Sequence, residues 1–118
     1  MDKIIIERAA YNCNLGVTED ERSLKQLIYL YLTLEFDMHR AGNSDSINDT
    51  LNYAVINKEI RGLLESKPFC LIETVAQEVS QLILKAYPVN SITVLVKKPN
   101  ALKNADCAAV EITRKRLS

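Results

Sequence analysis

The sequence predicts an α+β fold, in which an antiparallel sheet of four strands carries two helices on one face. Alternating apolar residues mark strands near both ends of the chain, and two segments between them have the apolar spacing of amphipathic helices. Turn-forming residues and prolines separate these segments. The resulting order is ββααββ, and because consecutive strands usually pair, each end of the chain should form a hairpin. The whole chain, residues 1–118, is expected to be a single domain.

Two strands are predicted in the N-terminal third of the chain, and the second has a regular alternation of apolar residues. Residues 3–11 form the first strand, and residues 27–37 form a longer second strand. Every even position of the second strand is apolar, whereas its odd positions are mixed, which predicts one buried face and one partly covered face. A highly charged turn at residues 16–26 connects the two strands, and Gly16 is expected to supply a positive φ there.

Two amphipathic helices follow a polar, turn-rich segment at residues 38–49. The first helix should begin near the Asn-Asp-Thr stretch and run to about Ser66, with Ser46 or Asp49 as its N-cap. Residues 71–87 form the second helix, after a proline that separates it from the first. The helical spacing predicts these buried residues: Ile56, Ile60, Leu63 and Leu64, then Ile72, Val75, Ala76, Val79, Leu82, Ile83 and Ala86.

The last two strands are residues 91–98 and 107–116, and both alternate between apolar and polar residues. With the helices on one face of the sheet, few residues remain to cover the other face. Another copy of the same chain is therefore expected to cover it.

Composition excludes several classes of protein. Fifteen basic and 15 acidic residues leave no net charge, which argues against nucleic-acid or membrane-surface partners. The chain has neither an apolar run of membrane-spanning length nor a signal-peptide pattern. The three cysteines, Cys13, Cys70 and Cys107, are odd in number and far apart, which fits reduced thiols in the cytoplasm. The single histidine, His39, has no nearby ligand set, so a zinc site is not expected.

Glu73 stands where an apolar run leads into the second helix. Its place in the first turn favours an ionised carboxylate, because the helix dipole is positive there. Two interpretations follow. Glu73 is either an ordinary first-turn acid, or a carboxylate on the shoulder of the apolar stripe that accepts a paired set of N–H donors from a guanidine-like ligand edge.

Three further side chains are candidates for chemistry. Lys98 continues the apolar phase of the third strand, so it either reaches out to solvent or is shielded enough to act as a base. Tyr53 is either a half-buried helix aromatic or a proton donor. Glu21 lies in the charged turn, where a solvated side chain is the usual case.

The sequence resembles the dihydroneopterin aldolase family over nearly its whole length. The most specific part of the resemblance is Asp-Thr-x-x-Tyr in the first helix and Leu-Ile-Glu in the second, followed by a strand that ends in Lys-Pro. Five stretches carry it, in order: GVTEDERSLKQ, SDSINDTLNYAVINKEI, FCLIETVAQEV, VLVKKPNAL and AAVEITRKR.

This resemblance implies a substrate-binding set. Glu73 would anchor a pterin ring through its N3–H and 2-amino edge, with the backbone of Leu71 and Ile72 alongside. Glu21 matches a family glutamate that lies near the site and binds substrate. Tyr53 would reach the reacting side of the substrate from a neighbouring subunit.

The resemblance also implies a lyase that needs no cofactor and no metal. Lys98 would donate and accept protons through a bound water, with Tyr53 at the reacting carbon. Retro-aldol cleavage of 7,8-dihydroneopterin would release glycolaldehyde and 6-hydroxymethyl-7,8-dihydropterin, a folate precursor, because the N5=C6 imine of the substrate accepts the electrons. Recapture of the intermediate on its other face would give 2′-epimerase activity.

Family members have the tunnelling fold, in which ββααββ subunits assemble side by side into a barrel. The resemblance therefore implies a homo-oligomer, with tetrameric rings that stack into an octamer and with sites between subunits. Such an assembly would account for the uncovered face of the sheet.

The sequence departs from the family pattern at two places. Leu15 replaces a histidine that many members have before the glycine, and the NALKNAD loop after Lys-Pro is short. INDTLNY and ALKNAD are also similar to dihydroneopterin triphosphate epimerases, so a triphosphate 2′-epimerase is the nearest alternative. Arg22, Lys25 and Lys103 are the cations available for a triphosphate. A pterin-binding ring protein without catalysis is the third interpretation.

Overall fold

A computed structural model describes residues 1–117. No helix among these residues has both the length and the apolar character needed to cross a membrane. Its elements are, in chain order, β1 (Lys3–Asn14), α1 (Glu19–Arg22), β2 (Lys25–Glu35), α2 (His39–Ser44), the 3₁₀ helix η1 (Ile47–Asp49), α3 (Tyr53–Glu65), α4 (Ile72–Ala86), β3 (Ser91–Pro99) and β4 (Cys107–Lys115).

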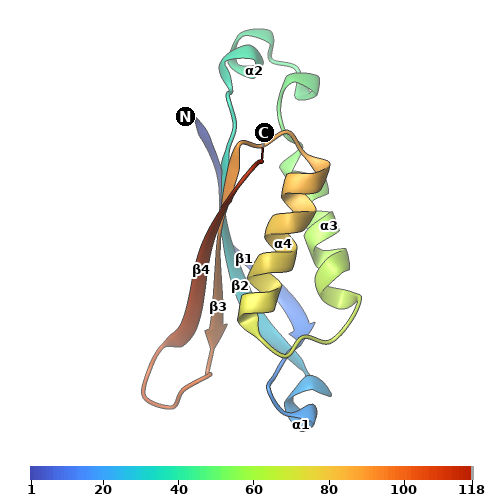
Figure 1. Cartoon of the computed structure of the whole chain (residues 1–118), viewed down its shortest axis with the longest axis vertical. Helices are drawn as coiled ribbons and strands as arrows, with labels where there is room; N and C mark the ends of the chain where they lie inside the picture. Colours follow the sequence, from blue (N-terminus) through green and yellow to red (C-terminus); the bar gives the residue numbers. More distant parts are fainter. Residues whose placement is uncertain (118) are drawn as a thin grey trace.

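The four strands form an antiparallel sheet in the order β1-β2-β3-β4. Both long helices, α3 and α4, pack on the same face of this sheet, and the subunit is elongated, with a longest extent of 50 Å (Figure 1). These observations confirm the predicted ββααββ order. Each predicted strand and long helix is present, with ends that differ from the prediction by a few residues.

Strand β1 contains a bulge that the sequence analysis misses. Between Ile6 and Ala9 the strand has one more residue than β2 opposite it, and Arg8 there has a φ of 50°. The extra residue reverses which side chains face the helices, so that Tyr11 and Cys13, at odd positions, are buried after the bulge. The strand extends beyond its predicted end to Asn14, with its odd positions facing the helices after the bulge.

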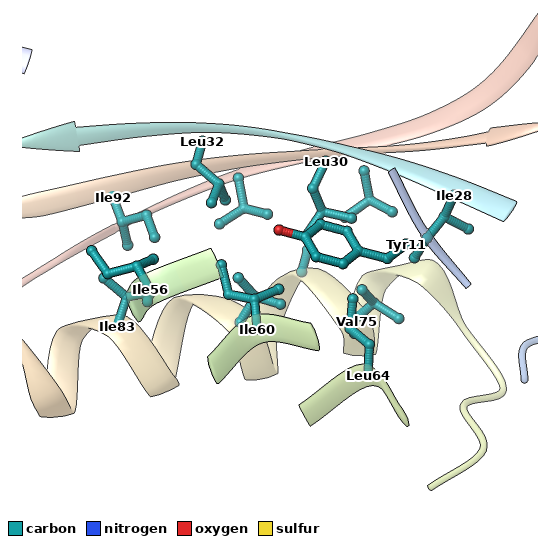
Figure 2. Packing of buried hydrophobic residues seen from close by; sticks show 14 of the residues in the cluster. Tyr11, Ile28, Leu30, Leu32, Ile56, Ile60, Leu64, Val75, Ile83 and Ile92 are labelled. Atoms are coloured by element: carbon teal, nitrogen blue, oxygen red, sulfur yellow. The ribbon is translucent and has the colours of Figure 1, made fainter. Parts of the chain in front are cut away.

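The core lies between the sheet and the two helices. The even-numbered apolar residues of β2, from Ile28 to Leu34, are fully buried, as predicted, whereas Phe36 is half-buried. The hydroxyl of Tyr11 reaches Asn57 of α3 at a short distance of 2.5 Å. Of the helix residues predicted to be buried, Ala86 alone is exposed. Figure 2 shows the packed side chains, including Ile28, Leu30 and Leu32 of β2, Ile92 of β3, Ile56, Ile60 and Leu64 of α3, and Val75 and Ile83 of α4.

The opposite face of the sheet carries two contacts between a cation and an aromatic ring, and no helix within residues 1–117 covers it (Figure 1). The guanidinium of Arg8 lies 4.3 Å from the ring centre of Tyr29, and the ammonium of Lys97 lies 4.7 Å from that of Tyr31. Both tyrosines are half-buried, whereas Ile5 is 59% exposed. Side chains of neighbouring strands therefore cover this face of the second strand only in part, and its coverage by another copy of the chain stays a prediction.

The predicted N-caps of the first long helix are wrong. Asn52 caps α3, because its side chain accepts hydrogen bonds from two backbone N–H groups of the first turn. Ser46 instead caps η1, and Asp49 forms an ion pair with Arg40 at 3.1 Å. Both segments predicted as turns contain a short helix, α1 in the first and α2 in the second.

Candidate functional site

Lys98 lies near the end of β3 with its side chain on the helix-facing side of the sheet. It continues the phase of the buried residues Val94 and Val96, and its side chain is 17% exposed. Its ammonium lies 3.5 Å from Oε2 of Glu21, which belongs to α1. The alternative of a lysine that reaches out to solvent does not describe this arrangement, because the side chain is largely shielded and has an acidic partner.

Glu21 is held by a capping box. Oε1 of Glu21 accepts hydrogen bonds from the hydroxyl of Thr18 at 3.0 Å and from the Thr18 backbone N–H at 3.3 Å. The backbone N–H of Glu21 donates in turn to the Thr18 hydroxyl oxygen. The Thr18 backbone, the Thr18 hydroxyl and then the charge of Lys98 hold the pKa of Glu21 below its ordinary value. The carboxylate is thus ionised and oriented, although 42% of its side chain is exposed.

Gly16 allows this close packing, but for a different reason from the predicted one. No glycine within residues 1–117 has a positive φ, so Gly16 does not supply the expected backbone conformation. A Cβ at Gly16 would instead lie 2.1 Å from Cβ of Glu21, much closer than two carbon atoms can approach. Gly16 therefore provides the space into which Glu21 packs.

Backbone and side-chain hydrogen bonds fix the loop that carries Glu21. Arg22 donates to the carbonyl oxygens of Gly16 and Val17, at 3.0 and 2.8 Å. The side-chain amide of Gln26 donates to the carbonyl oxygens of Leu15 and Glu21. Sequence analysis does not single out Thr18 or Gln26, although the Thr-x-x-Glu spacing is a recognisable signal for a capping box.

Glu73 occupies the first turn of α4. The N-cap of this helix, Leu71, makes no side-chain capping bond, so backbone N–H groups of the first turn are not capped by a side chain. Glu73 is exposed and takes part in none of the ion pairs found among residues 1–117. Ile72 is half-buried and Leu71 is 45% exposed. The position of Glu73 on the shoulder of the apolar stripe therefore leaves its side chain facing solvent within one subunit, where it is not partly buried.

Tyr53 lies away from these residues. It begins α3, next to α2 and η1, at the end of the molecule opposite α1 and the carboxyl end of β3 (Figure 1). Tyr53 is the first residue of α3, whereas Glu73 is in the first turn of α4, which begins near the last residue of α3. The 13 residues of α3 span roughly 20 Å, so Tyr53 and Glu73 are separated by about that distance. Tyr53 is 64% exposed and lines a surface hollow of about 530 Å³ together with residues of α2 and η1.

No group of three or more metal-ligating side chains lies together in the part of the chain that the structure describes. The three cysteines are free: Cys13 is buried, Cys70 is exposed and Cys107 is half-buried. Burial raises the pKa of the Cys13 thiol to about 11. The candidate site thus consists of an ammonium, two carboxylates and an uncapped helix start at one end of the subunit, with a phenol at the other end.

A sequence profile of the dihydroneopterin aldolase family, FolB, matches residues 4–113. The chain belongs to the dihydroneopterin aldolase family. The dihydroneopterin aldolase of Haemophilus influenzae is 34% identical over 114 residues, which are 97% of each protein. Membership confirms the family predicted from the sequence, and it confirms that the chain is an enzyme of the dihydroneopterin aldolase type.

Solved structures of dihydroneopterin aldolases have the same fold. FolB from Vibrio cholerae O1 biovar El Tor superimposes with a TM-score of 0.96 at 34% identity, covering 98% of both chains. The Escherichia coli dihydroneopterin aldolase, solved in complex with neopterin, gives a TM-score of 0.93 at 30% identity and covers 97% of this chain and 99% of its own. These matches confirm the predicted α+β architecture.

Leu15 is buried, with 1% of its surface exposed, and it pairs with Phe69 in an isolated parallel bridge. The residue that stands in place of the histidine of many dihydroneopterin aldolases is thus part of the core.

Proposed function

We propose that this protein cleaves 7,8-dihydroneopterin by a retro-aldol reaction to 6-hydroxymethyl-7,8-dihydropterin and glycolaldehyde, in folate biosynthesis. The observation that carries the proposal is the shielded ammonium of Lys98, which lies 3.5 Å from the carboxylate of Glu21. This pair lies at the same end of the subunit as the start of α4, which carries Glu73 (Figure 1). Family membership supports the reaction, and the neopterin complex of the E. coli relative supports a pterin as ligand.

Glu73 is proposed to bind the pterin ring. Its carboxylate can accept two parallel hydrogen bonds, which matches the N3–H and 2-amino groups at one edge of the ring. Glu73 stands at the positive end of the α4 dipole, and the backbone of Leu71 and Ile72 offers polar groups alongside it. The solvent exposure of Glu73 in the subunit leaves it accessible to a ligand. Glu21 is proposed to contact the substrate beside Lys98.

Lys98 is proposed to move the proton that starts cleavage. Acting through a bound water and in its neutral amine form, the lysine removes the proton of the 2′-hydroxyl and becomes an ammonium, and the C1′–C2′ bond breaks to release glycolaldehyde. The electron pair of that bond flows into the N5=C6 imine, and N5 takes up a proton to form an enamine. Protonation of C1′ and loss of the N5 proton then give the 6-hydroxymethyl product, so that the substrate itself serves as the electron sink.

Tyr53 of a neighbouring subunit is proposed to deliver the proton to C1′. Within one subunit, Tyr53 lies at the far end from Lys98, which supports a site shared between two copies. If the released glycolaldehyde turns over and presents the opposite face of its carbonyl carbon, C2′, when C1′ of the enamine adds back to it, the product is the 2′ epimer. The proposed enzyme therefore has epimerase activity as a side reaction of the same intermediate.

A barrel of subunits is the proposed assembly, with tetrameric rings stacked into an octamer. Strands β1 and β4 are the edges of the sheet and carry unpaired backbone groups in the isolated subunit, which supports side-by-side pairing between copies. In this proposal residues 1–118 act as one aldolase domain. The free cysteines support a cytoplasmic site of action.

Product analysis tests the function. The purified protein and its Lys98→Ala variant are incubated separately with 7,8-dihydroneopterin and with its triphosphate, and the pterins and glycolaldehyde are separated by chromatography. Lysine-dependent release of glycolaldehyde from dihydroneopterin supports the aldolase. A 2′ epimer formed from the triphosphate alone identifies an epimerase instead, and substrate binding without any product identifies a pterin-binding protein without catalysis. Arg22 is already bonded to two loop carbonyls, which weighs against it as a triphosphate ligand.

A further inference from the structure

The two oxygens of the Glu21 carboxylate have different partners. Oε1 accepts from the Thr18 hydroxyl and backbone N–H, whereas Oε2 faces the ammonium of Lys98. The Thr18 hydroxyl donates to Oε1 while its oxygen accepts from the Glu21 N–H, which uses both capacities of one hydroxyl group. Thr18 thus holds Glu21 at two points, at the carboxylate of its side chain and at its backbone N–H.

This double contact matters because little else restrains the Glu21 side chain. It is 42% exposed, and a single ion pair with a partly exposed carboxylate does not by itself hold two long side chains in one geometry. The loop around it, in contrast, is tied down by Arg22 and Gln26. Thr18 therefore attaches the long, flexible side chain of Glu21 to a loop whose backbone is held in place by hydrogen bonds.

We propose that Thr18 is a positioning residue whose hydroxyl holds the carboxylate of Glu21 so that Oε2 remains beside Lys98. Glu21 in turn directs the ammonium of Lys98 toward the place where a proton is transferred. Gly16 is part of the same device, because any side chain there would displace the Cβ of Glu21. This inference rests on the proposed role of Lys98 in proton transfer.

Two substitutions at Thr18 separate its hydroxyl from its shape. Thr18→Val keeps the branched shape and removes the hydroxyl, whereas Thr18→Ser keeps the hydroxyl. Because Glu21 orients the ammonium of Lys98 and also contacts the substrate, we expect Thr18→Val to lower kcat about tenfold and to raise KM for dihydroneopterin by a smaller factor. Thr18→Ser should retain nearly the wild-type kcat. An unchanged kcat in Thr18→Val overturns the inference.

A control variant and a double substitution exclude a merely structural effect. Ser23→Ala removes the hydroxyl that donates to the Asp20 carbonyl at the other end of α1, and it leaves the Glu21 carboxylate untouched. It should have the wild-type kcat. If Thr18 acts through Glu21, the double variant Thr18→Val/Glu21→Gln should have nearly the same kcat as Glu21→Gln alone, and any further decrease should be much smaller than tenfold. A full additional tenfold loss in the double variant shows that Thr18 acts by another route, which contradicts the inference.

An NMR measurement keeps the inference testable independently of the reaction. The ¹³Cε signal of Lys98, assigned with Lys98→Arg, is recorded in the wild type and in the Thr18 and Glu21 variants. We expect the signal in Thr18→Val to move toward its position in Glu21→Gln, and the signal in Thr18→Ser to stay at the wild-type position. If the wild type fails to cleave dihydroneopterin but these shifts occur, the proposed function fails while the positioning by Thr18 stands. If Thr18→Val leaves the signal in place, the positioning fails even in an active aldolase.

Discussion

Leu15, which follows β1, and Phe69, which lies shortly before α4, are joined by an isolated parallel bridge. Gly16 donates its backbone N–H to the Phe69 carbonyl at 3.0 Å, and Phe69 donates to the Asn14 carbonyl at 2.8 Å. This bridge connects the loop that carries Glu21 to the segment that leads into Glu73's helix. The proposed ring-binding group and the partner of the proposed catalytic lysine are therefore built on one hydrogen-bonded frame.

The first prediction concerns Glu73. Glu73→Gln keeps the size of the side chain but removes its charge and turns one acceptor into a donor, which would face the N–H edge of a pterin. We expect guanine and pterin analogues to bind at least about tenfold more weakly, which corresponds to about 1.4 kcal/mol. The loss of the favourable dipole interaction should lower the free energy of unfolding by no more than about 1 kcal/mol. Calorimetric titration measures the affinity.

Glu78→Gln is the matched control, because Glu78 lies on the same helix and pairs with Lys67 instead of facing a ligand. It should bind analogues as the wild type does. Equal affinities in wild type and Glu73→Gln would make Glu73 an ordinary first-turn acid, which is the alternative interpretation of its position.

The second prediction is a pH dependence of stability that involves Glu21. Lys98 faces this carboxylate from β3, and Glu19 and Asp20 flank it in α1. Because hydrogen bonds from Thr18 and the charge of Lys98 lower its pKa in the folded protein, the unfolded chain takes up a proton first as the pH falls. The stabilisation is therefore present above the ordinary pKa of 4.5 and is lost as the pH falls through the lower folded value.

Urea unfolding of the wild type and Glu21→Gln, at one protein concentration, measures this effect. The wild type should be the more stable of the two at about pH 7, and the difference should shrink toward about pH 3. A difference that stays constant over this range would show that the charge of Glu21 does not contribute to stability.

Most elements of the fold are predictable because their apolar periods are uninterrupted. The even positions of β2 and the buried stripe of α4 repeat regularly, so strand, helix and buried face follow directly. The bulge in β1 is not predictable in this way, because the residue with positive φ is Arg8, whereas glycine or asparagine usually signals this conformation. The sequence therefore does not reveal that the buried side of β1 changes from even to odd positions.

The candidate site likewise has a part that can be predicted from local sequence and a part that depends on the fold. Lys98 and Glu73 are identified from local position, Lys98 by the phase of its strand and Glu73 by its place at a helix start. The contact between Lys98 and Glu21 joins residues far apart in the sequence, and only the fold brings them together. The space at Gly16 is likewise a tertiary property, since a sequence pattern records that a glycine is present but not which neighbour requires it.

The third prediction tests the backbone strain at Arg8. Arg8→Gly should change the free energy of unfolding by less than about 1 kcal/mol, because relief of the left-handed conformation offsets the lost cation–π contact with Tyr29 and the greater freedom of glycine when unfolded. Arg8→Val places a β-branched side chain in the same conformation and should destabilise the fold by about 1–3 kcal/mol. Chemical unfolding compares the variants. A valine variant as stable as the glycine variant contradicts the assigned φ.

The fourth prediction concerns assembly. A homo-oligomer larger than a dimer is expected for two reasons. The subunit leaves one face of its sheet without helices, and the outer edges of β1 and β4 pair with no other strand of the subunit. Multi-angle light scattering at micromolar concentration measures the mass. A stable monomer at that concentration contradicts both the barrel and the shared site.

The fifth prediction separates proton removal from proton delivery. Lys98→Ala should lower kcat by about 10²–10⁴-fold, the usual contribution of a positioned acid–base group, with a much smaller change in substrate affinity. Tyr53→Phe removes a hydroxyl from an exposed side chain, so folding should be unaffected. Cleavage should continue in this variant, but the enamine should lack its proton donor and react with oxygen to an oxidised pterin. Single-turnover product analysis distinguishes slow cleavage in Lys98→Ala from oxidised product in Tyr53→Phe.

Mixed oligomers of these two variants test whether the site is shared. If each site takes Lys98 from one subunit and Tyr53 from another, random co-assembly of equal amounts of Lys98→Ala and Tyr53→Phe places both native residues at about a quarter of the sites. The yield of the 6-hydroxymethyl product should then recover to about a quarter of the wild-type yield, in proportion to those restored sites. Pre-formed oligomers mixed without subunit exchange provide the control and should show no recovery. Because Tyr53 and Lys98 lie at opposite ends of one subunit, a failure of co-assembled oligomers to recover activity would remove Tyr53 from the site.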